Sequence, residues 1–270
     1  MTQTVLITGS AGIIGSQLRG SLAQVGRHLR LLDIAAQHEL APGEDAELIS
    51  ASFTDDDAIL EACRGADVVV HLGGLSTGGY SWDEYLDVNI NGTFRLFEAA
   101  RRAGVPRVIY ASSHHAVGFH PNTPGVTVPD YLFARPDSFY GVSKAASESL
   151  ASLYHDRYGI DVICLRIGSY RDRPTDERVL WNWLSPDDCT RLFEAAIVTP
   201  SPGFRLVWGV SANTRGIMSL AEAAAIGYHP MDNAEDFAHQ IIAGTALGDP
   251  ELHQRIGGPY TSPTFDDREA

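Results

Sequence analysis

The sequence predicts an α/β protein, a Rossmann-type doubly wound parallel sheet with a small C-terminal region that caps it. Two observations support this fold class. Over the first part of the chain, short apolar runs alternate with helical patterns of roughly ten to fifteen residues, an order typical of right-handed βαβ units. Beyond residue 168 this alternation stops. We therefore expect a core over residues 1–168 and a cap over residues 169–270, packed together as one compact unit.

The elements of the core follow from the spacing of the apolar residues. An apolar run over residues 5–8 indicates a strand, and Leu18, Leu22 and Val25 then recur at helical spacing up to Gly26. Residues 118–136 form an irregular, proline-rich segment. Further strands are predicted at residues 29–32, 47–50, 67–72, 107–111 and 162–166, and helices at residues 55–63, 81–103 and 140–158.

The cap contains shorter pieces. A polar loop leads to a helical pattern over residues 179–184. The run Ser185-Pro186-Asp187-Asp188 then supplies an N-cap residue, a proline at the first helical position and first-turn acids, which predicts the start of another helix. A strand at residues 205–210, a short helix near residues 219–225 and a polar tail complete the prediction.

The composition limits the kinds of partner. With 34 acidic against 20 basic side chains the formal net charge is −14, which argues against nucleic acid and against an anionic membrane surface. Cys63, Cys164 and Cys189 form no C-x-x-C pair and lie in apolar stretches, so we expect buried free thiols and no metal site. Without a signal-peptide pattern or an apolar run near the roughly 18 residues of a membrane span, a cytoplasmic location is expected.

A glycine-rich turn directly follows the first predicted strand and opens the first helix. Gly9, Gly12 and Gly15 have the G-x-x-G-x-x-G spacing that lets a backbone approach a pyrophosphate at a helix N-terminus. Asp33 ends the second strand, where a carboxylate accepts hydrogen bonds from adenosine ribose hydroxyls and repels the extra phosphate of NADP. Neither the turn nor the residues after Asp33 offer a cation for that phosphate, so NAD is the predicted cofactor.

The single lysine of the chain, Lys144, lies four residues after Tyr140 and hence on the same helix face. Unlike arginine, lysine is a compact point charge that fits beside a ring and a cofactor. Use of tyrosine as a base near neutral pH requires its pKa to fall by roughly 2 to 3 units, and one ammonium at about 5 Å supplies about 3 kcal/mol. We expect Lys144 to supply most of this lowering of the Tyr140 pKa, and we expect Ser113 to hold the reacting hydroxyl.

Ligands bind at the carboxyl ends of strands in open α/β sheets. Three predicted strand ends are rich in polar or glycine residues, which makes them candidate parts of one site. They are residues 72–76 with Ser76, residues 112–115 with His114 and His115, and residues 166–169 with Ser169.

These motifs resemble the extended short-chain dehydrogenase/reductase superfamily and, within it, the uronate dehydrogenase family. The wider resemblance rests on residues 8–15, Asn89, Ser113, and Tyr140 with Lys144. The narrower one rests on short stretches that cover nearly the whole chain. They are residues 71–76, 111–118, 140–144, 166–169, Arg178, 183–185, 207–213 and 232–235.

The resemblance implies NAD-dependent oxidation of the C1 hydroxyl of a cyclic hexuronic acid, such as glucuronate or galacturonate, to an aldarolactone. Tyr140 is then the base, Lys144 binds the nicotinamide ribose and Arg178 binds the substrate carboxylate, a contact that suits a forked guanidinium. The implied cofactor contacts are Gly9, Gly12, Ile13, Ile14, Gly15, Asp33, Ile34, Ser52, Phe53, Leu72, Gly73, Asn89, Lys144, Ile167 and Tyr170. The implied sugar contacts are Ser76, Ser113, His114, His115, Ser169 and Arg178.

The chain departs from that family at several places, and other functions stay open. His114 replaces an asparagine, and Ser52 with Phe53 replaces an Asp-Leu pair near the adenine. One alternative is a neutral aldose or sugar-phosphate 1-dehydrogenase. Less favoured are a sugar epimerase or dehydratase, for which the region after Ser169 is short, and a non-catalytic NAD-sensing protein. Extended relatives pair through helices that correspond to residues 81–103 and 140–158, so a homo-oligomer is expected.

Overall fold

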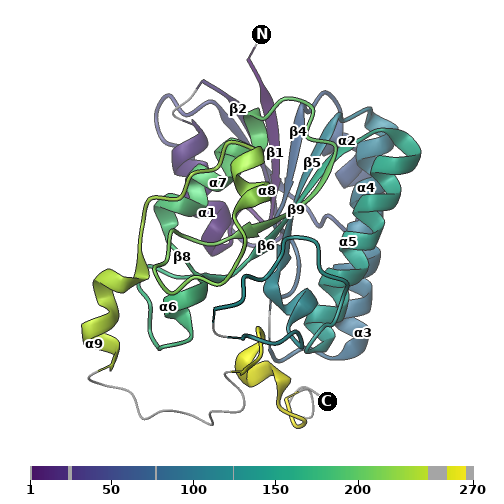
Figure 1. The fold of residues 1–270 in the computed structure, drawn as a ribbon. Coiled ribbons are helices and arrows are strands. Elements are labelled where there is room, and N and C mark those ends of the chain that lie inside the picture. The colour runs from purple at the N-terminus through teal and green to yellow at the C-terminus, as the bar shows by residue number, and fades with distance from the viewer. Residues whose placement is uncertain (1, 24–25, 77, 124, 243–253, 266–270) are drawn as a thin grey trace.

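The computed structural model describes residues 2–23, 26–76, 78–123, 125–242 and 254–265. Its body is a seven-stranded sheet in which every neighbouring pair is parallel, in the order β3-β2-β1-β4-β5-β6-β9 (Figure 1). The Rossmann-type fold class is thereby confirmed. The strands are β1 (Thr4–Thr8), β2 (His28–Asp33), β3 (Ala46–Ser50), β4 (Val68–His71), β5 (Arg107–Ser113), β6 (Asp161–Ile167) and β9 (Phe204–Gly209).

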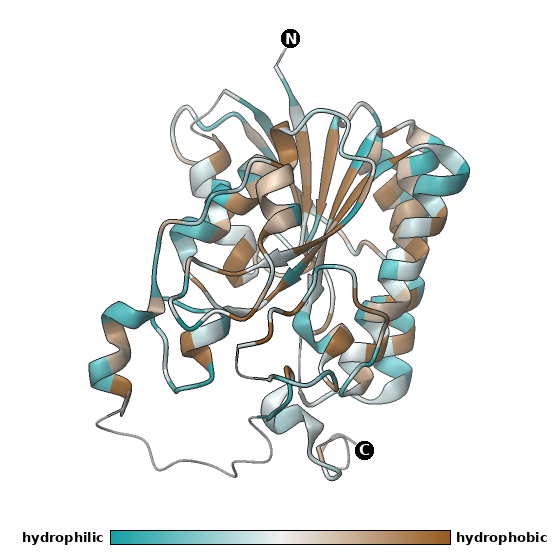
Figure 2. Ribbon diagram, in the orientation of Figure 1, coloured by the Kyte–Doolittle hydropathy of each residue, from teal (hydrophilic) through white to brown (hydrophobic). Residues whose placement is uncertain are grey.

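Helices cover both faces of the sheet (Figure 1). One face carries α1 (Ile13–Leu22), α7 (Pro186–Val198) and α8 (Ala221–Ala225). The other carries α2 (Asp56–Cys63), α4 (Gly92–Ala103) and α5 (Phe139–Tyr158). Figure 2 shows the strands as hydrophobic over most of their length, as expected for a parallel sheet that is buried on both sides.

The strand order reverses at the centre of the sheet, and this reversal places the candidate site. The chain moves outward from β1 through β2 to β3, then crosses back to β4 on the other side of β1. At such a switch point the loops after neighbouring strands diverge and leave a crevice at the carboxyl ends. The loop after β1 therefore borders one side of the crevice and the loop after β4 borders the other, and the loops after β5 and β6 continue the β4 side.

The segment predicted as one helix over residues 81–103 is divided into three parts. The short helix α3 (Trp82–Glu84) begins in a capping box between Ser81 and Glu84, and a π-helical segment, η2 (Tyr85–Asn91), follows before α4. π-Helical turns are frequent at functional sites. Here the irregular turn contains Asn89, which is one of the predicted site residues.

Residues 169–270 differ from the prediction at several points, and their strand β9 belongs to the seven-stranded sheet itself. The helix expected over residues 179–184 is shorter in the structure, where α6 spans Val179–Asn182. Trp183 and Leu184 instead form β8 and pair with β7 (Ser169–Tyr170). The Trp183 indole also donates to the carbonyl of Arg171 at 2.7 Å, which favours the extended backbone. The helix start predicted at Ser185 is confirmed, since its hydroxyl accepts from the Asp188 N–H of α7 at 2.9 Å.

The C-terminal stretch expected to be a polar tail contains helical elements. Residues 234–242 form η4 (Ala234–Phe237) and α9 (Ala238–Ile242), and residues 254–265 include η6 (Gly258–Thr261). This last segment is docked by main-chain hydrogen bonds at 2.7–3.0 Å between residues 118–122 and residues 254–257. Ile256 is fully buried, so the prediction of a purely polar tail is wrong for this stretch. Residues 266–270 lie outside the described residues.

The cysteine prediction is confirmed by the packing. Cys63, Cys164 and Cys189 are buried free thiols in the two apolar layers that flank the sheet. Burial raises the pKa of each thiol, so these side chains are neutral packing groups near neutral pH. In the described part of the chain, none of the helices combines the length and apolar content needed to cross a bilayer.

The two glycines at opposite ends of α1 should respond oppositely to the same substitution. A Cβ atom at Gly20 meets no heavy atom within 4 Å, so Gly20→Ala should stabilise the protein by about 0.5–1 kcal/mol through helix propensity. A Cβ atom at Gly15 lies 2.4 Å from the Gly9 carbonyl oxygen, so Gly15→Ala should destabilise by about 1–3 kcal/mol. Thermal unfolding of the two variants checks both signs, and a Gly15→Ala protein as stable as the parent would contradict the packing described.

Candidate active site

The turn after β1 packs so closely that only glycine fits. Gly9 has a φ of 72°, and a Cβ atom there would lie 2.7 Å from the main-chain nitrogen of Gly73. The start of α1 has Gly12 as its N-cap residue, with no side chain accepting from the first N–H groups. These N–H groups are therefore available to an anion such as a pyrophosphate. The turn fits the dinucleotide that the sequence predicts.

Asp33 lies at the end of β2, next to this turn. Its two carboxylate oxygens accept from the N–H groups of Ala11 and Ala35, each at 2.9 Å, so the side chain joins the glycine turn to the loop after β2. Asp33 borders a cavity of about 290 Å³. The other lining residues are Gly9, Gly12, Leu32, Ile34, Ala51, Ser52, Phe53, Thr54, Leu72, Gly73, Gly74, Leu75 and Val88.

A second cavity of about 440 Å³ continues toward the centre of the sheet. It shares Gly9, Gly12, Leu72, Gly74 and Leu75 with the first, so the two form one groove across the strand ends. Its other lining residues are Ile13, Ile14, Gly15, Ser76, Ala111, Ser112, Tyr140, Lys144, Ile167 and Tyr170. The groove thus brings together 14 of the 15 predicted cofactor residues, and the remaining one is Asn89.

Asn89 acts on the groove through its neighbours. Its amide oxygen accepts from the Leu75 N–H at 2.7 Å, and its amide nitrogen donates to the Leu75 carbonyl and to the Ser143 hydroxyl, each at 3.0 Å. The side chain is almost fully buried. Asn89 therefore fixes the loop after β4 against α5, which positions one wall of the groove.

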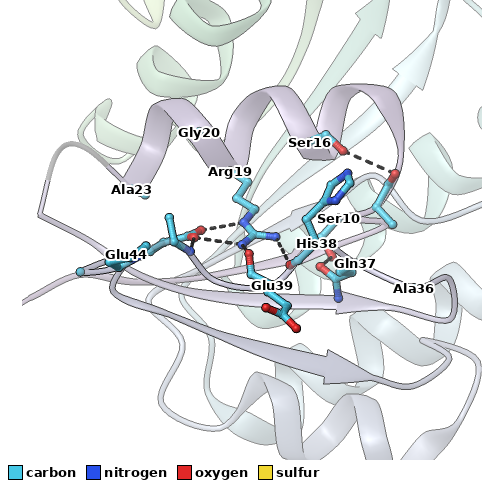
Figure 3. Close-up of a pocket in the computed structure, with 14 residues that line it drawn as sticks. Ser10, Ser16, Arg19, Gly20, Ala23, Ala36, Gln37, His38, Glu39 and Glu44 are labelled. Carbon is cyan, nitrogen blue, oxygen red and sulfur yellow. Dashed lines mark hydrogen bonds and ion pairs between the residues drawn. The ribbon is translucent and has the colours of Figure 1, made fainter.

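Another cavity, of about 580 Å³, lies between α1 and the loop after β2 (Figure 3). Arg19 crosses it and donates to both carboxylate oxygens of Glu44 at 2.6 and 2.9 Å and to the carbonyls of His38 and Glu39. Ser10 donates to Gln37 at 2.9 Å on its other side. These contacts anchor the loop that follows Asp33, and the reactive groups predicted from the sequence all lie outside this cavity.

The predicted catalytic residues meet at the junction of α5 and β5. The Ser138 hydroxyl accepts from the Gly141 N–H at 3.1 Å and caps α5, so Tyr140 and Lys144 lie in its first turns. The Tyr140 phenol is hydrogen-bonded with Ser113. The Lys144 ammonium donates to the carbonyl of Ala111 at 2.8 Å and lies 5.4 Å from the centre of the Tyr140 ring.

The electrostatics of this group differ from the sequence-based expectation. Burial raises the pKa of Tyr140, and the hydrogen bond with Ser113 acts in the opposite direction. Burial also lowers the pKa of Lys144 to about 8. The net shift of the Tyr140 pKa in the protein alone is therefore upward, and the lowering expected from Lys144 together with the bound cofactor stays a prediction. The physical reason is that desolvation of a largely buried phenol outweighs one nearby ammonium.

His114 and His115 begin a short 3₁₀ segment, η3 (His114–Val117), directly after β5. The His114 Nδ1 atom lies 3.0 Å from the carbonyl oxygen of Ile167 and must be the donor, because a carbonyl only accepts. Burial lowers the pKa of His114 well below its ordinary value, so the ring is neutral and Nε2 carries a lone pair. Among the described residues this buried Nε2 has no hydrogen-bond partner.

Arg178 is the predicted carboxylate ligand and lies beside both histidines. Its charge lowers the pKa of His114 and of His115, and burial lowers its own pKa. Its one assigned hydrogen bond is to the Gly257 carbonyl at a long 3.4 Å. Within the described ranges, no carboxylate forms an ion pair with it. A partly buried guanidinium with no described carboxylate at ion-pair distance is suited to bind the negative charge of a ligand, although the charges of Asp176 and Asp137 also act on it.

Two residues of this region were missed by the sequence reasoning. The fully buried Asp137 carboxylate lies 2.7 Å from His115 Nδ1, and burial raises its pKa to about 6. Added Cβ atoms at Gly118 and Gly257 would lie 1.8 and 1.9 Å from its oxygen, so it is enclosed on both sides. The Tyr260 ring lies 4.1 Å from that of His115. The position of Asp137 three residues before Tyr140 could have suggested it, whereas nothing local indicates Tyr260.

The remaining predicted sugar residues divide between the groove and this buried cluster. Ser76 lines the second cavity, and Ser169 is a buried residue of β7. Ser113, His114, His115 and Arg178 lie behind the groove and do not line it. Within the described residues no set of three or more His, Cys, Asp or Glu side chains is arranged to hold a metal ion.

Comparison with known proteins agrees with this geometry. Residues 5–184 match the model of the NAD dependent epimerase/dehydratase family. A uronate dehydrogenase of Pseudomonas syringae pv. tomato is 40% identical over 98% of this chain and 95% of that protein. An NAD-dependent glucose-6-phosphate dehydrogenase of Haloferax volcanii is 37% identical over 89% of this chain and 97% of that protein.

The three-dimensional comparison extends the match to a cofactor complex. The crystal structure of a tyrosine-to-alanine mutant of uronate dehydrogenase from Agrobacterium tumefaciens, complexed with NAD, superposes with a TM-score of 0.90. It is 36% identical and covers 98% of this chain and 99% of that chain. The superposition therefore extends beyond residue 184, where the family match ends.

The charge of Asp33 should determine the choice between NAD and NADP. Asp33→Asn keeps the shape but removes the repulsion of a 2′-phosphate, so the ratio of kcat/KM for NADP to that for NAD should rise at least about tenfold. Asp45→Asn is the matched control, because this acid is exposed and lies at the far end of the same loop. Initial rates with both cofactors give the ratio, and a parent enzyme that uses NADP as well as NAD would exclude this role.

Proposed function

The chain belongs to the NAD-dependent epimerase/dehydratase family and, within it, to the uronate dehydrogenases, and from this premise we propose that it oxidises C1 of a hexuronic acid. It is an NAD-dependent dehydrogenase that acts on a CH–OH group. The proposed substrate is glucuronate or galacturonate in its cyclic form, and the product is the aldarolactone. The observation that supports the acidic substrate is Arg178, which lies partly buried beside two neutral histidines and forms no ion pair with a described carboxylate.

The proposed chemistry assigns one task to each residue at the α5–β5 junction. NAD, when bound, supplies the acceptor for the hydride from C1. Tyr140 removes the proton of the C1 hydroxyl, and Ser113, which already contacts the phenol, holds that hydroxyl in line. Because burial opposes ionisation of Tyr140, the proton transfer needs additional positive charge close to the phenol. Lys144 contributes its ammonium, held by the Ala111 carbonyl, to the side of the site where the ribose is expected.

The proposed recognition of the sugar uses the cluster behind the groove. Arg178 takes the carboxylate through two parallel N–H donors, which fit a planar acid. His114 accepts from a sugar hydroxyl, because its Nδ1 atom is committed to Ile167 and its Nε2 atom is the remaining lone pair. His115 is oriented by Asp137, and the Tyr260 ring lies against its face. Ser76 and Ser169 complete the proposed set.

An alternative substrate follows from one of the relatives. The Haloferax volcanii protein is named an NAD-dependent glucose-6-phosphate dehydrogenase, and a guanidinium binds phosphate as readily as carboxylate. Parallel assays with glucuronate, galacturonate, glucose, galactose and glucose 6-phosphate distinguish these substrates by the rate of NADH formation. The epimerase and NAD-sensing functions predict no net NADH formation with any of these sugars.

The proposal also includes assembly and location. Exposed apolar side chains lie on the outer faces of α4 and α5, where Phe94, Leu153 and Tyr158 are 47, 41 and 44% exposed. A self-complementary contact through these two helices would cover them, so we propose a homo-oligomer. A cytoplasmic location is proposed because the three cysteines are free thiols, a state typical of a reducing compartment.

Loss of the Tyr140 hydroxyl should abolish turnover without loss of the fold. Tyr140→Phe should lower kcat by at least about a thousandfold, since the proton transfer and its hydrogen bond with Ser113 are removed together. Tyr158→Phe, at the exposed end of the same helix, is the matched control and should keep full activity. Retention of more than about a tenth of kcat in Tyr140→Phe would remove this residue from the mechanism.

The Arg178 guanidinium should determine the preference for an acidic sugar. Arg178→Ala should lower kcat/KM for glucuronate or galacturonate by at least about a hundredfold and leave NAD affinity unchanged, because one partner of a buried ion pair is lost. Arg173→Ala, an exposed arginine of the same loop, is the control and should have little effect. Steady-state kinetics with a uronate and its matching neutral aldose measure the preference. Equal loss on both substrates, or a parent enzyme that prefers the neutral sugar, would refute the uronate assignment.

A further inference from the structure

A buried ion pair lies directly behind Lys144. The Arg166 guanidinium donates to both Glu148 oxygens at 2.9 and 2.8 Å, and the Ser112 hydroxyl donates to one of them at 2.6 Å. Arg166 also donates to the carbonyls of Asp130 and Leu132 at 3.1 and 3.2 Å. Arg166 and Glu148 are 1 and 7% exposed, so the pair is enclosed and Glu148 is held in one position.

Glu148 continues the catalytic face of α5. Tyr140, Lys144 and Glu148 are spaced by four residues and therefore lie in one row. Three consecutive residues at the end of β5 hold this row. The Ser113 side chain contacts Tyr140, the Ala111 carbonyl contacts Lys144, and the Ser112 side chain contacts Glu148.

Stability alone is a weak reason for such a pair. Burial of two charges costs about as much as their attraction returns, and well-packed apolar side chains of similar volume often serve as well or better. The neighbouring α4–α5 layer is filled with apolar side chains such as Leu96, Phe97 and Ala151, which shows that this face of the sheet accepts them. An electrostatic role of the Glu148 charge is therefore a better explanation of the pair than stability.

Among the ionisable groups that the structure places around Lys144, Glu148 is the carboxylate that can balance its positive charge. Beside Tyr140 and Glu148 on its own helix, Lys144 faces Tyr110 of β5, Cys164 of β6 and His71 of β4. Burial raises the pKa of Tyr110 and of Cys164 well above their ordinary values and lowers that of His71 to about 3. These three groups are therefore neutral near pH 7 to 8, whereas Glu148 is charged and bound to Arg166.

We propose that Glu148 is a positioning residue that keeps the Lys144 side chain in its ammonium form at the pH of catalysis, with Arg166 and Ser112 holding the carboxylate in place. The proposal rests on the proposed function in one respect, since the catalytic use of the ammonium belongs to that function. The effect of Glu148 on the protonation of Lys144 is a property of the protein itself.

The sign of the pH effect follows from the burial of Lys144. Its pKa is lowered to about 8 by burial, and the Glu148 charge acts against this lowering. The ammonium is present below this pKa and is lost as the pH rises through it. Removal of the Glu148 charge should lower the pKa further, so the ammonium is lost at a lower pH. The alkaline limb of the rate profile should move in the same direction.

The composition of the chain makes a direct measurement possible. Because Lys144 is the single lysine, labelling with lysine enriched in ¹³C at the ε carbon places one side-chain resonance in the whole protein. Its chemical shift against pH gives the ionisation midpoint of Lys144 without cofactor, substrate or resonance assignment. The same samples, assayed with NAD and whichever sugar the parent enzyme oxidises best, give the pH profile of kcat.

In Glu148→Gln the lysine midpoint should fall by about one pH unit or more, a tenfold change in the ionisation constant, and the alkaline limb of kcat should shift equally. Glu148→Asp, which keeps the charge, should restore most of both midpoints. Glu194→Gln is the matched control, because it breaks the Arg27–Glu194 ion pair on the other side of the sheet and should leave both midpoints unchanged.

A folded Glu148→Gln protein with an unchanged lysine midpoint would overturn the proposal, whatever its activity. Since this variant leaves Arg166 buried without its acid, a second variant, Glu148→Gln with Arg166→Met, removes both charges. Its lysine midpoint should also be lower than that of the parent, but by less than in the single variant, because the unpaired Arg166 cation no longer adds to the lowering. A shifted midpoint in a protein whose parent oxidises no uronate would leave this proposal standing and refute the proposed function. An unchanged lysine midpoint in a protein whose parent oxidises uronates would refute this proposal and leave the proposed function standing.

Discussion

The contact between one face of α5 and the last three residues of β5 is the interaction on which the site depends. Helix α5 presents Tyr140, Lys144 and Glu148 in one row, and Ala111, Ser112 and Ser113 each hold one of them. A strand advances about 3.3 Å per residue, whereas a row on a helix advances about 6 Å per step. A main-chain carbonyl and two serine side chains are therefore used together for three successive strand residues to hold one helical row. Any change in the crossing of these two elements would separate the phenol from its serine and the ammonium from its carbonyl.

The same contact concentrates charge in a region where charge is costly. Lys144 and Arg166 are buried and Arg178 is partly buried near the ends of β5 and β6, in a chain whose net charge is −14. Arg166 has a bidentate carboxylate, and Lys144 has a carbonyl with Glu148 nearby. Arg178 has only a long contact to a main-chain carbonyl among the described residues. This difference separates a structural cation from one suited to a ligand, and it supports a substrate that brings its own negative charge.

Two further contacts complete the site. One is a close approach of two main chains, and the other joins segments that are distant in sequence. The glycine turn after β1 contacts the loop after β4 at Gly9 and Gly73, which narrows the groove where the dinucleotide fits. On the other side, residues 254–257 pair with residues 118–122 and bring Gly257 and Tyr260 over Asp137 and His115. The proposed sugar region is thus assembled from the end of β5 with η3, the start of α5, the residue before α6 and the C-terminal segment.

The sequence by itself determined those features whose signal is local. The glycine turn, Asp33 at a strand end and the Tyr140–Lys144 spacing each lie within a few residues, where steric and periodic rules act directly, and they were sufficient for the fold class and the course of the groove. Tertiary structure decided the rest. Trp183 and Leu184 became a strand because β7 was there to pair with them, and Asp137 and Tyr260 joined the site through contacts with residues 22 and 145 positions away in the chain. The direction of the Tyr140 pKa shift also depended on enclosure by several elements, because desolvation is set by everything that surrounds a group and not by its neighbours in sequence.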